Sequence, residues 1–175
     1  LWQTRMCLEL RGKTLGLVGL GKIGGQVAGF AKAFGMDIIA WSQNLTQERC
    51  DEVGAELVSK SELFTRADFV TIHMVLSDRS RGLVTSDDLG RMKPDAFLVN
   101  TSRGPIVDQT ALLAVLKAGS IRGAAIDVYD HEPLPTAHPF RSLDNVVISP
   151  HMGYVTEETY RIFHGHSVEN IQAWH

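Results

Sequence analysis

The 175-residue sequence predicts an α/β fold, in which a doubly wound parallel sheet carries helices on both faces and so forms three layers. Two observations predict this fold. Short apolar segments, typical of strands buried on both faces, alternate with segments whose apolar residues recur at helical spacing. Turn and capping residues separate these segments. Such a fold binds its ligand at the carboxyl ends of the strands, so the residues that follow each strand are the functional candidates.

The first strand and the first helix are joined by a glycine-rich turn, LGLVGLGKIGG, at residues 15–25. The strand is expected at residues 13–18. Gly19 lets the chain turn sharply off this strand, Gly21 lets an anion approach the backbone, and Gly24 lets the helix pack closely. A pyrophosphate could then accept hydrogen bonds from the N–H groups at the helix start. The turn therefore predicts a Rossmann-type dinucleotide site.

The segments after the turn have the order that a dinucleotide site requires. The expected helix ends at Gly35, and a second strand follows at residues 37–41. The apolar face of the helix is expected to consist of Ile23, Val27, Phe30, Ala31 and Phe34. Strand, glycine turn, helix and strand together form a βαβ unit.

The rest of the chain continues the alternation. Further strands are expected at residues 56–58, 68–74, 96–100, 124–128 and 146–149. Helices are expected within residues 43–54, at 61–64, from 85 to the proline at 94, at 108–117 and from 156 onward, whereas residues 1–11 resemble the end of a helix. Capping residues Thr85 and Asp108 indicate two of the helix starts, and Gly119 indicates a helix end.

The composition is that of an ordinary globular protein, with 44% hydrophobic and 21% charged residues. A formal net charge of −3 gives no electrostatic reason to expect nucleic acid or an anionic membrane as a partner. No apolar run reaches the length of a membrane span. The cysteines, Cys7 and Cys50, lack metal-ligand spacing, so no metal is expected. Two isolated cysteines suggest a reducing compartment, and we expect the cytoplasm.

Two polar residues follow strands close to the glycine turn. Ser42 follows the second strand, where an NAD site usually has an acid that binds the ribose hydroxyls. Positions 43–45 contain no Arg or Lys to pair with the 2′-phosphate of NADP, which favours NAD, although Arg49 could supply such a contact. NADP therefore stays open. His73 lies at the end of the fourth strand, either as a hydrogen-bonded structural residue or as a contact to the cofactor.

Three later strands end in loops with charged or titratable residues. Arg103 follows the fifth strand beside a glycine, where it could bind a carboxylate through two hydrogen bonds. Glu132 lies in the acidic loop after the sixth strand, and His151 follows the seventh. Each residue alone would most often be structural or solvated. Because parallel strands end at one edge of a sheet, Arg103, Glu132 and His151 are predicted to converge beside the nicotinamide.

The sequence resembles the D-isomer-specific 2-hydroxyacid dehydrogenases in four segments. These are LRGKTLGLVGLGKIG (10–24), VNTSRGPIVD (99–108), GAAIDVYDHEPLP (123–135) and ISPHMGYVT (148–156). They agree in content, order and approximate spacing, and the resemblance covers almost the whole chain. It implies that residues 1–175 are the NAD(P)-binding domain of a homodimeric enzyme whose substrate domain comes from sequence before and after this segment.

The resemblance also implies a role for each matched residue. Arg103 would bind the carboxylate and carbonyl of a 2-keto acid, His151 would be the general acid/base, and Glu132 would be its partner. A histidine titrates near neutrality and can give a proton to the developing alkoxide, and a neighbouring carboxylate favours its charged form. Cofactor contacts would come from Gly19, Gly21, Lys22, Ile23 and Gly24 in the turn, from Asp127 near the nicotinamide amide, and from Thr101 and Ser102.

Proteins with other activities share this fold and some of the same residues. Formate-oxidising members pair the histidine with glutamine, which Glu132 argues against. Phosphite-oxidising members and transcriptional corepressors keep the same Arg, Glu and His, and the corepressors use dinucleotide binding to control partner recruitment. Because the substrate domain is expected outside this segment, the chain alone is expected to bind a dinucleotide but to turn over 2-keto acids negligibly.

Overall fold

The computed structural model describes residues 6–174, and its strands form one parallel sheet in the order β3-β2-β1-β4-β5-β6-β7. The strands are β1 (Thr14–Val18), β2 (Asp37–Trp41), β3 (Glu56–Leu57), β4 (Phe69–Ile72), β5 (Phe97–Asn100), β6 (Gly123–Ile126) and β7 (Val146–Ile148). Each predicted strand is present, and several are one to three residues shorter than predicted. The chain leaves β1 in one direction to β2 and later returns to β4 on its other side, so a topological switch point lies between β1 and β4.

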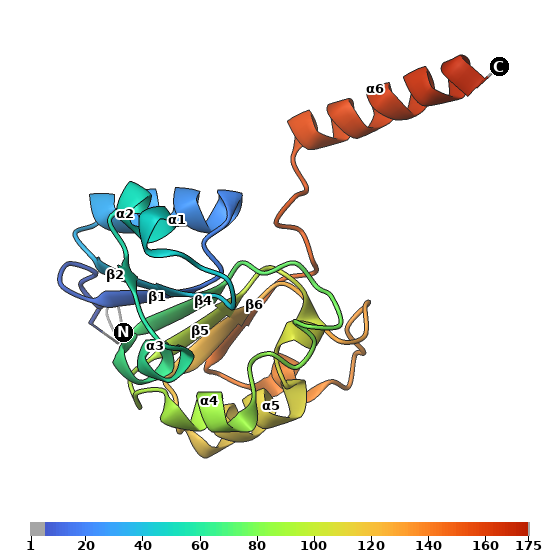
Figure 1. Ribbon diagram of the computed structural model, residues 1–175. Coiled ribbons are helices and arrows are strands. Elements are labelled where there is room, and N and C mark those ends of the chain that lie inside the picture. Colours follow the sequence, from blue (N-terminus) through green and yellow to red (C-terminus); the bar gives the residue numbers. More distant parts are fainter. Residues whose placement is uncertain (1–5, 175) are drawn as a thin grey trace.

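Helices cover both faces of the sheet, which confirms the three predicted layers. The helices are α1 (Lys22–Ala33), α2 (Gln47–Val53), α3 (Lys60–Arg66), α4 (Ser86–Arg91), α5 (Gln109–Ala118) and α6 (Glu157–Trp174), with short 3₁₀ turns η1 (Gly104–Ile106) and η2 (Pro139–Ser142). Helices α1 and α2 lie on one face, and α3, α4 and α5 lie on the other (Figure 1). Thr85 and Asp108 cap α4 and α5 as predicted, and Gly119 ends α5 in the left-handed conformation.

Two apolar cores hold the layers together. The larger core lies between the sheet and α3, α4 and α5, and contains the fully buried side chains of Leu63, Phe64 and Leu98. The smaller core lies under α1 and α2 and includes Leu17 and Ala28. Because both faces of the central strands are buried, the strand ends are held rigidly where they open toward ligands.

The predicted apolar face of α1 is wrong for most of its residues. The helix buries Gly24, Ala28 and Ala31, whereas Phe30 and Phe34 are 68% and 62% exposed. A Cβ at Gly24 would lie 2.3 Å from the carbonyl oxygen of Gly19, so only a small residue fits where the helix leaves the turn. The close approach of helix and turn therefore selects the face with the small residues, and Ile23 is also left exposed.

The two ends of the chain differ from the body of the fold. Residues 6–10 are not helical, contrary to the expected helix end, and residues 1–5 of that expectation lie outside the described residues. The final helix forms as predicted, but α6 buries none of its side chains and extends away from the sheet (Figure 1). Within residues 6–174 no helix combines the length and the apolar character that crossing a membrane would require.

Candidate active site

The glycine turn has the geometry that each of its glycines was predicted to provide. Gly19 has a φ of 101°, and a Cβ there would lie 2.6 Å from the carbonyl oxygen of His73. Around Gly21, the N-cap of α1, no atom lies within 4 Å of a Cβ position, and no side chain caps the helix. The helix start is thus open to an anion, as a pyrophosphate site requires.

A groove runs from this turn along the carboxyl ends of the strands. Its first part is a cavity of about 670 Å³ between the glycine turn, the loop after β2 and the loop after β4. A second cavity of about 380 Å³ continues from the β4 loop to the loop after β5. The two cavities share His73, Met74 and Val75. The groove therefore crosses the switch point between β1 and β4, where doubly wound folds bind their ligands.

Ser42 and His73 both line the first cavity, beside Gly19 and Gly21. The His73 side chain is half-buried, and its Nε2 lies 3.1 Å from the hydroxyl oxygen of Thr71. Burial lowers the pKa of His73 below its ordinary value, so its ring is neutral at neutral pH. His73 thus has a structural hydrogen bond and also faces the groove; its contact with a cofactor stays a prediction.

The loop after β5 is fixed by its own hydrogen bonds. Ser102 donates its N–H to Asn100 Oδ1 at 3.1 Å and its hydroxyl to the carbonyl of Ile72 at 2.6 Å. Asn100 donates to the carbonyl oxygen of Arg103 at 3.1 Å, and the Arg103 side chain stays exposed. A Cβ on Gly104 would lie 2.1 Å from the carbonyl carbon of Tyr129. This glycine therefore lets the Arg103 loop lie directly against the loop after β6.

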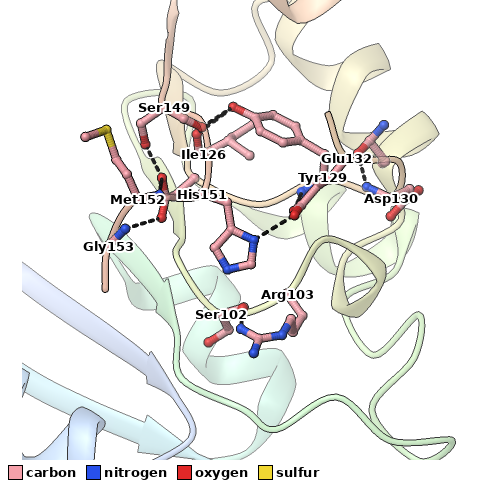
Figure 2. A network of polar contacts seen from close by, with 12 residues as sticks. Ser102, Arg103, Ile126, Tyr129, Asp130, Glu132, Ser149, His151, Met152 and Gly153 are labelled. Atoms are coloured by element: carbon pink, nitrogen blue, oxygen red, sulfur yellow. Dashed lines mark hydrogen bonds and ion pairs between the residues drawn. The ribbon is translucent and has the colours of Figure 1, made fainter. Parts of the chain in front are cut away.

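Glu132 and His151 form an ion pair across the loops after β6 and β7. Glu132 Oε2 lies 2.6 Å from His151 Nδ1, and Glu132 Oε1 accepts the N–H of Tyr129 at 2.8 Å (Figure 2). Burial raises the pKa of Glu132, but the hydrogen bonds from His151 and Tyr129, with the charges of His151 and Arg103, bring it below its ordinary value. Glu132 is thus ionised at neutral pH. With Nδ1 donating to it, Nε2 of the imidazole is left to exchange a proton.

Asp127 anchors the loop that carries His151. Its carboxylate accepts hydrogen bonds from the hydroxyl of Ser149 and, at 2.9 Å each, from the N–H groups of Met152 and Gly153 (Figure 2). Burial opposes ionisation, but these donors lower the pKa of Asp127 below its ordinary value. His151 has a φ of 54°, which costs a residue other than glycine on the order of 1–3 kcal/mol. The bonds on both sides of His151 hold it in this conformation.

The side chains of Arg103, Glu132 and His151 face one another. In Figure 2 the imidazole of His151 points toward the guanidinium of Arg103, with Glu132 on its other side. A cation that can bind an anion, an imidazole that can give a proton and a carboxylate that stabilises the imidazolium thus lie together. This arrangement can bind a carboxylate and protonate a neighbouring oxygen.

The structure brings most of the predicted site residues to this edge of the sheet. Ile23, Thr101 and Ser102 line the second cavity with Arg103. Five of the predicted residues are not among the described residues that line the two groove cavities: Lys22, Gly24, Asp127, Glu132 and His151. Glu132 and His151 line a separate cavity of about 650 Å³. The assigned roles of these residues toward a cofactor or substrate stay predictions.

Several residues that shape the site were not singled out by the sequence. Asn100 and Gly104 fix the Arg103 loop, while Tyr129 donates its hydroxyl to the carbonyls of Ile126 and Ser149, at 3.0 and 2.9 Å. Their position at the ends of strands was the one feature of the sequence that could have pointed to them. Asn100 and Tyr129 each bond a residue three positions away, whereas the contacts of Tyr129 with Ser149 and with Gly104 join different loops and are visible only in the folded chain.

In the full-length protein, replacing Glu132 with glutamine should shift the pH dependence of any turnover in which His151 gives up a proton. Glutamine can still accept the Nδ1 hydrogen bond but cannot stabilise the imidazolium by its charge, so the protonated form is lost at lower pH. We expect the alkaline decline of kcat to move to lower pH, with kcat at pH 8 falling more than kcat at pH 6. The measurement is a pH–rate profile of both proteins.

A matched control is Glu56→Gln, which removes an exposed carboxylate paired with Arg66 far from the site in the fold. Its profile should coincide with that of the unmodified protein. An unchanged profile for Glu132→Gln would contradict an electrostatic role. In the unmodified protein the ionised form of Glu132 is lost as pH falls through its lowered pKa, so the stabilisation from its hydrogen bonds is present above its ordinary pKa and lost in acid.

The fold and the site together define a dinucleotide-binding domain that carries a Glu–His pair at the same edge of the sheet as its groove. The chain belongs to the D-isomer specific 2-hydroxyacid dehydrogenase family. Residues 1–153 match the sequence model of that family's NAD binding domain. This confirms the predicted family and the predicted NAD-binding domain.

Known relatives agree with this membership. A glyoxylate reductase from Aeropyrum pernix is 44% identical over 175 residues, which cover 99% of this chain and 52% of that protein. A phosphoglycerate oxidoreductase from Vibrio cholerae matches with a TM-score of 0.90 and 43% identity, over 95% of this chain and 54% of that chain. An acyclic imino acid reductase, solved with NADPH and D-Arg, matches with a TM-score of 0.81 and 34% identity, over 97% of this chain and 53% of that chain. The chain spans about half the length of these relatives.

Proposed function

We propose that this chain is the nucleotide-binding part of an enzyme that transfers a hydride between NAD(P)H and a 2-keto acid, forming a D-2-hydroxy acid. The observation that carries this proposal is the Glu132–His151 pair, held at 2.6 Å at the same strand edge as the dinucleotide groove. Arg103 lies between this pair and the groove's second cavity. Hydride transfer to a keto acid requires a proton donor and a carboxylate anchor beside the nicotinamide.

When bound, the nicotinamide cofactor supplies the hydride. Arg103 would bind the substrate carboxylate and polarise its carbonyl, which fixes the reacting carbon. His151 would donate the proton on Nε2 to the alkoxide oxygen, while Glu132 holds Nδ1 and stabilises the imidazolium. In the direction of oxidation, His151 would take the hydroxyl proton. Asp127 would act through the loop that it anchors and keep His151 in place.

The names of the relatives support a small carboxylate-bearing substrate. One is a glyoxylate reductase and another a phosphoglycerate oxidoreductase. Because the chain spans about half of such proteins, we propose that a substrate domain outside residues 1–175 forms the other wall of the cleft. That wall would orient the substrate and exclude water. The 175-residue chain alone should therefore bind a dinucleotide but reduce keto acids negligibly.

Two further expectations concern the intact protein. A homodimer is supported by the exposed apolar side chains of Phe30 and Phe34 on α1, since such side chains gather at interfaces. A cytoplasmic location is supported by the free thiols of Cys7 and Cys50. The partner that we propose for the site itself is a small 2-keto or 2-hydroxy acid.

The function is tested by a reductase assay of the full-length protein against a panel of 2-keto acids. NADH and NADPH are each supplied, and nicotinamide oxidation is followed at a fixed pH. We expect turnover of at least one keto acid, with the D-isomer as product. Dinucleotide binding without turnover of any keto acid would contradict the proposal and would favour a sensing role for the fold.

A further inference from the structure

The end of the groove remote from Arg103 has an unusual charge for an NAD site. In a doubly wound fold the adenosine ribose lies beside the residue that follows β2. Here that residue is Ser42, in the same cavity as Gly21. No aspartate or glutamate is among the described residues that line this cavity, whereas Arg49 and Arg79 are. The described lining thus lacks the carboxylate that would bind the ribose hydroxyls and repel a 2′-phosphate, and it contains two arginines instead.

Arg49 is held in place by the glycine turn. Its Nε donates to the carbonyl of Leu20 at 3.0 Å, and its second terminal nitrogen donates to the carbonyl of Gly21 at 3.3 Å. Its first terminal nitrogen pairs with Glu52, an exposed residue one helical turn further along α2. A guanidinium carries more N–H donors than these contacts use. Arg49 is therefore a pre-positioned cation with donors to spare at the rim of the ribose end.

The other polar groups of this cavity match a phosphate as well. Ser42, Asn44 and Thr46 come from the loop after β2 and offer hydroxyl and amide donors. Arg79 comes from the loop after β4. Cationic groups from α2 and from the loop after β4, together with neutral donors in the same cavity, suit a doubly charged anion better than a pair of ribose hydroxyls.

We propose that this end of the groove binds the 2′-phosphate of NADP(H), with Arg49 as its charged contact, so that the protein binds NADPH at least as tightly as NADH. The proposal rests on the dinucleotide site of the proposed function and names which dinucleotide that site takes. It does not depend on which substrate the protein reduces.

The test compares the dissociation constants of NADPH and NADH, measured by fluorescence titration of the purified full-length protein without substrate. The unmodified protein should bind NADPH as tightly as NADH or more tightly. Arg49→Gln should weaken NADPH binding about tenfold or more and change NADH binding much less, because only NADPH carries the phosphate. Ser42→Asp should shift the preference toward NADH. Arg66→Gln, which also breaks an exposed Arg–Glu pair, here between the end of α3 and Glu56 of β3, should leave both constants unchanged.

The outcomes separate this inference from the proposed function. Tenfold tighter binding of NADH than of NADPH by the unmodified protein would overturn the inference and leave the dehydrogenase proposal standing. Equal weakening of both nucleotides by Arg49→Gln would also overturn it, because Arg49 would then only brace the glycine turn. Binding of neither nucleotide would overturn the inference together with the cofactor site on which it rests.

Discussion

Replacement of His151 by glutamine should reduce the kcat for 2-keto acid reduction by about 10²–10⁴-fold, the range that general acid/base catalysis contributes. Glutamine has a similar length but cannot give up a proton at neutral pH. The imidazole is held by Glu132 at 2.6 Å, and its loop is anchored by Asp127, so its position in the site is specific. The measurement is steady-state kinetics of the full-length protein and its variant with saturating cofactor.

The dissociation constant of the cofactor serves as the internal control for His151→Gln. It should stay within about threefold of the unmodified value, since the groove is built from the glycine turn and the β2, β4 and β5 loops. His166→Gln, an exposed histidine on α6, provides a matched substitution outside the site. Near-normal kcat in His151→Gln for every keto acid that the protein reduces would exclude His151 as the proton donor.

Replacement of Arg103 by alanine should lower kcat/KM for keto acids by on the order of 100-fold, with KM raised and kcat reduced together. The reason is that one guanidinium would bind the substrate carboxylate and also polarise the reacting carbonyl. Arg103→Lys keeps the charge but loses the planar pair of donors, so it should recover only part of the activity. The measurement is a comparison of kcat and KM for the three proteins.

The control for Arg103 is Arg91→Ala, which removes an exposed arginine paired with Asp87 on α4. Its kinetic constants should not change. If Arg103→Ala raised the dissociation constant of the cofactor as much as KM, the residue would be a cofactor contact instead of a substrate anchor. The prediction therefore depends on measuring both constants.

Much of the fold was predictable because the local sequence patterns agree with the rule that parallel strands end at one edge of the sheet. The spacing of Gly19, Gly21 and Gly24 predicted a turn whose geometry the structure confirms, down to the open space at Gly21. The rule that parallel strands end at one edge predicted that Glu132 and His151 would meet, although they lie on different loops. Strand boundaries were less certain, since apolar residues continue beyond the ends of β4 and β6.

The failed prediction for α1 shows what periodicity alone could not decide. Large apolar residues recur on one side of this helix, yet Phe30 and Phe34 are exposed and Gly24 and Ala28 are buried. The distance between helix and turn decides this orientation, and that distance depends on the whole βαβ unit. A hydrophobic pattern cannot distinguish a face that packs within the domain from one left to a partner.

By itself, the sequence determined the sheet and the glycine turn and predicted that Arg103, Glu132 and His151 would lie at one edge, because these follow from local patterns and from the common edge of parallel strands. The tertiary structure alone decided how they are held. The left-handed conformation of His151, the anchoring of its loop by Asp127, and the place of Arg49 against Leu20 and Gly21 all depend on contacts between distant segments. The physical reason is that hydrogen bonds act over about 3 Å, and only the folded chain brings their partners that close.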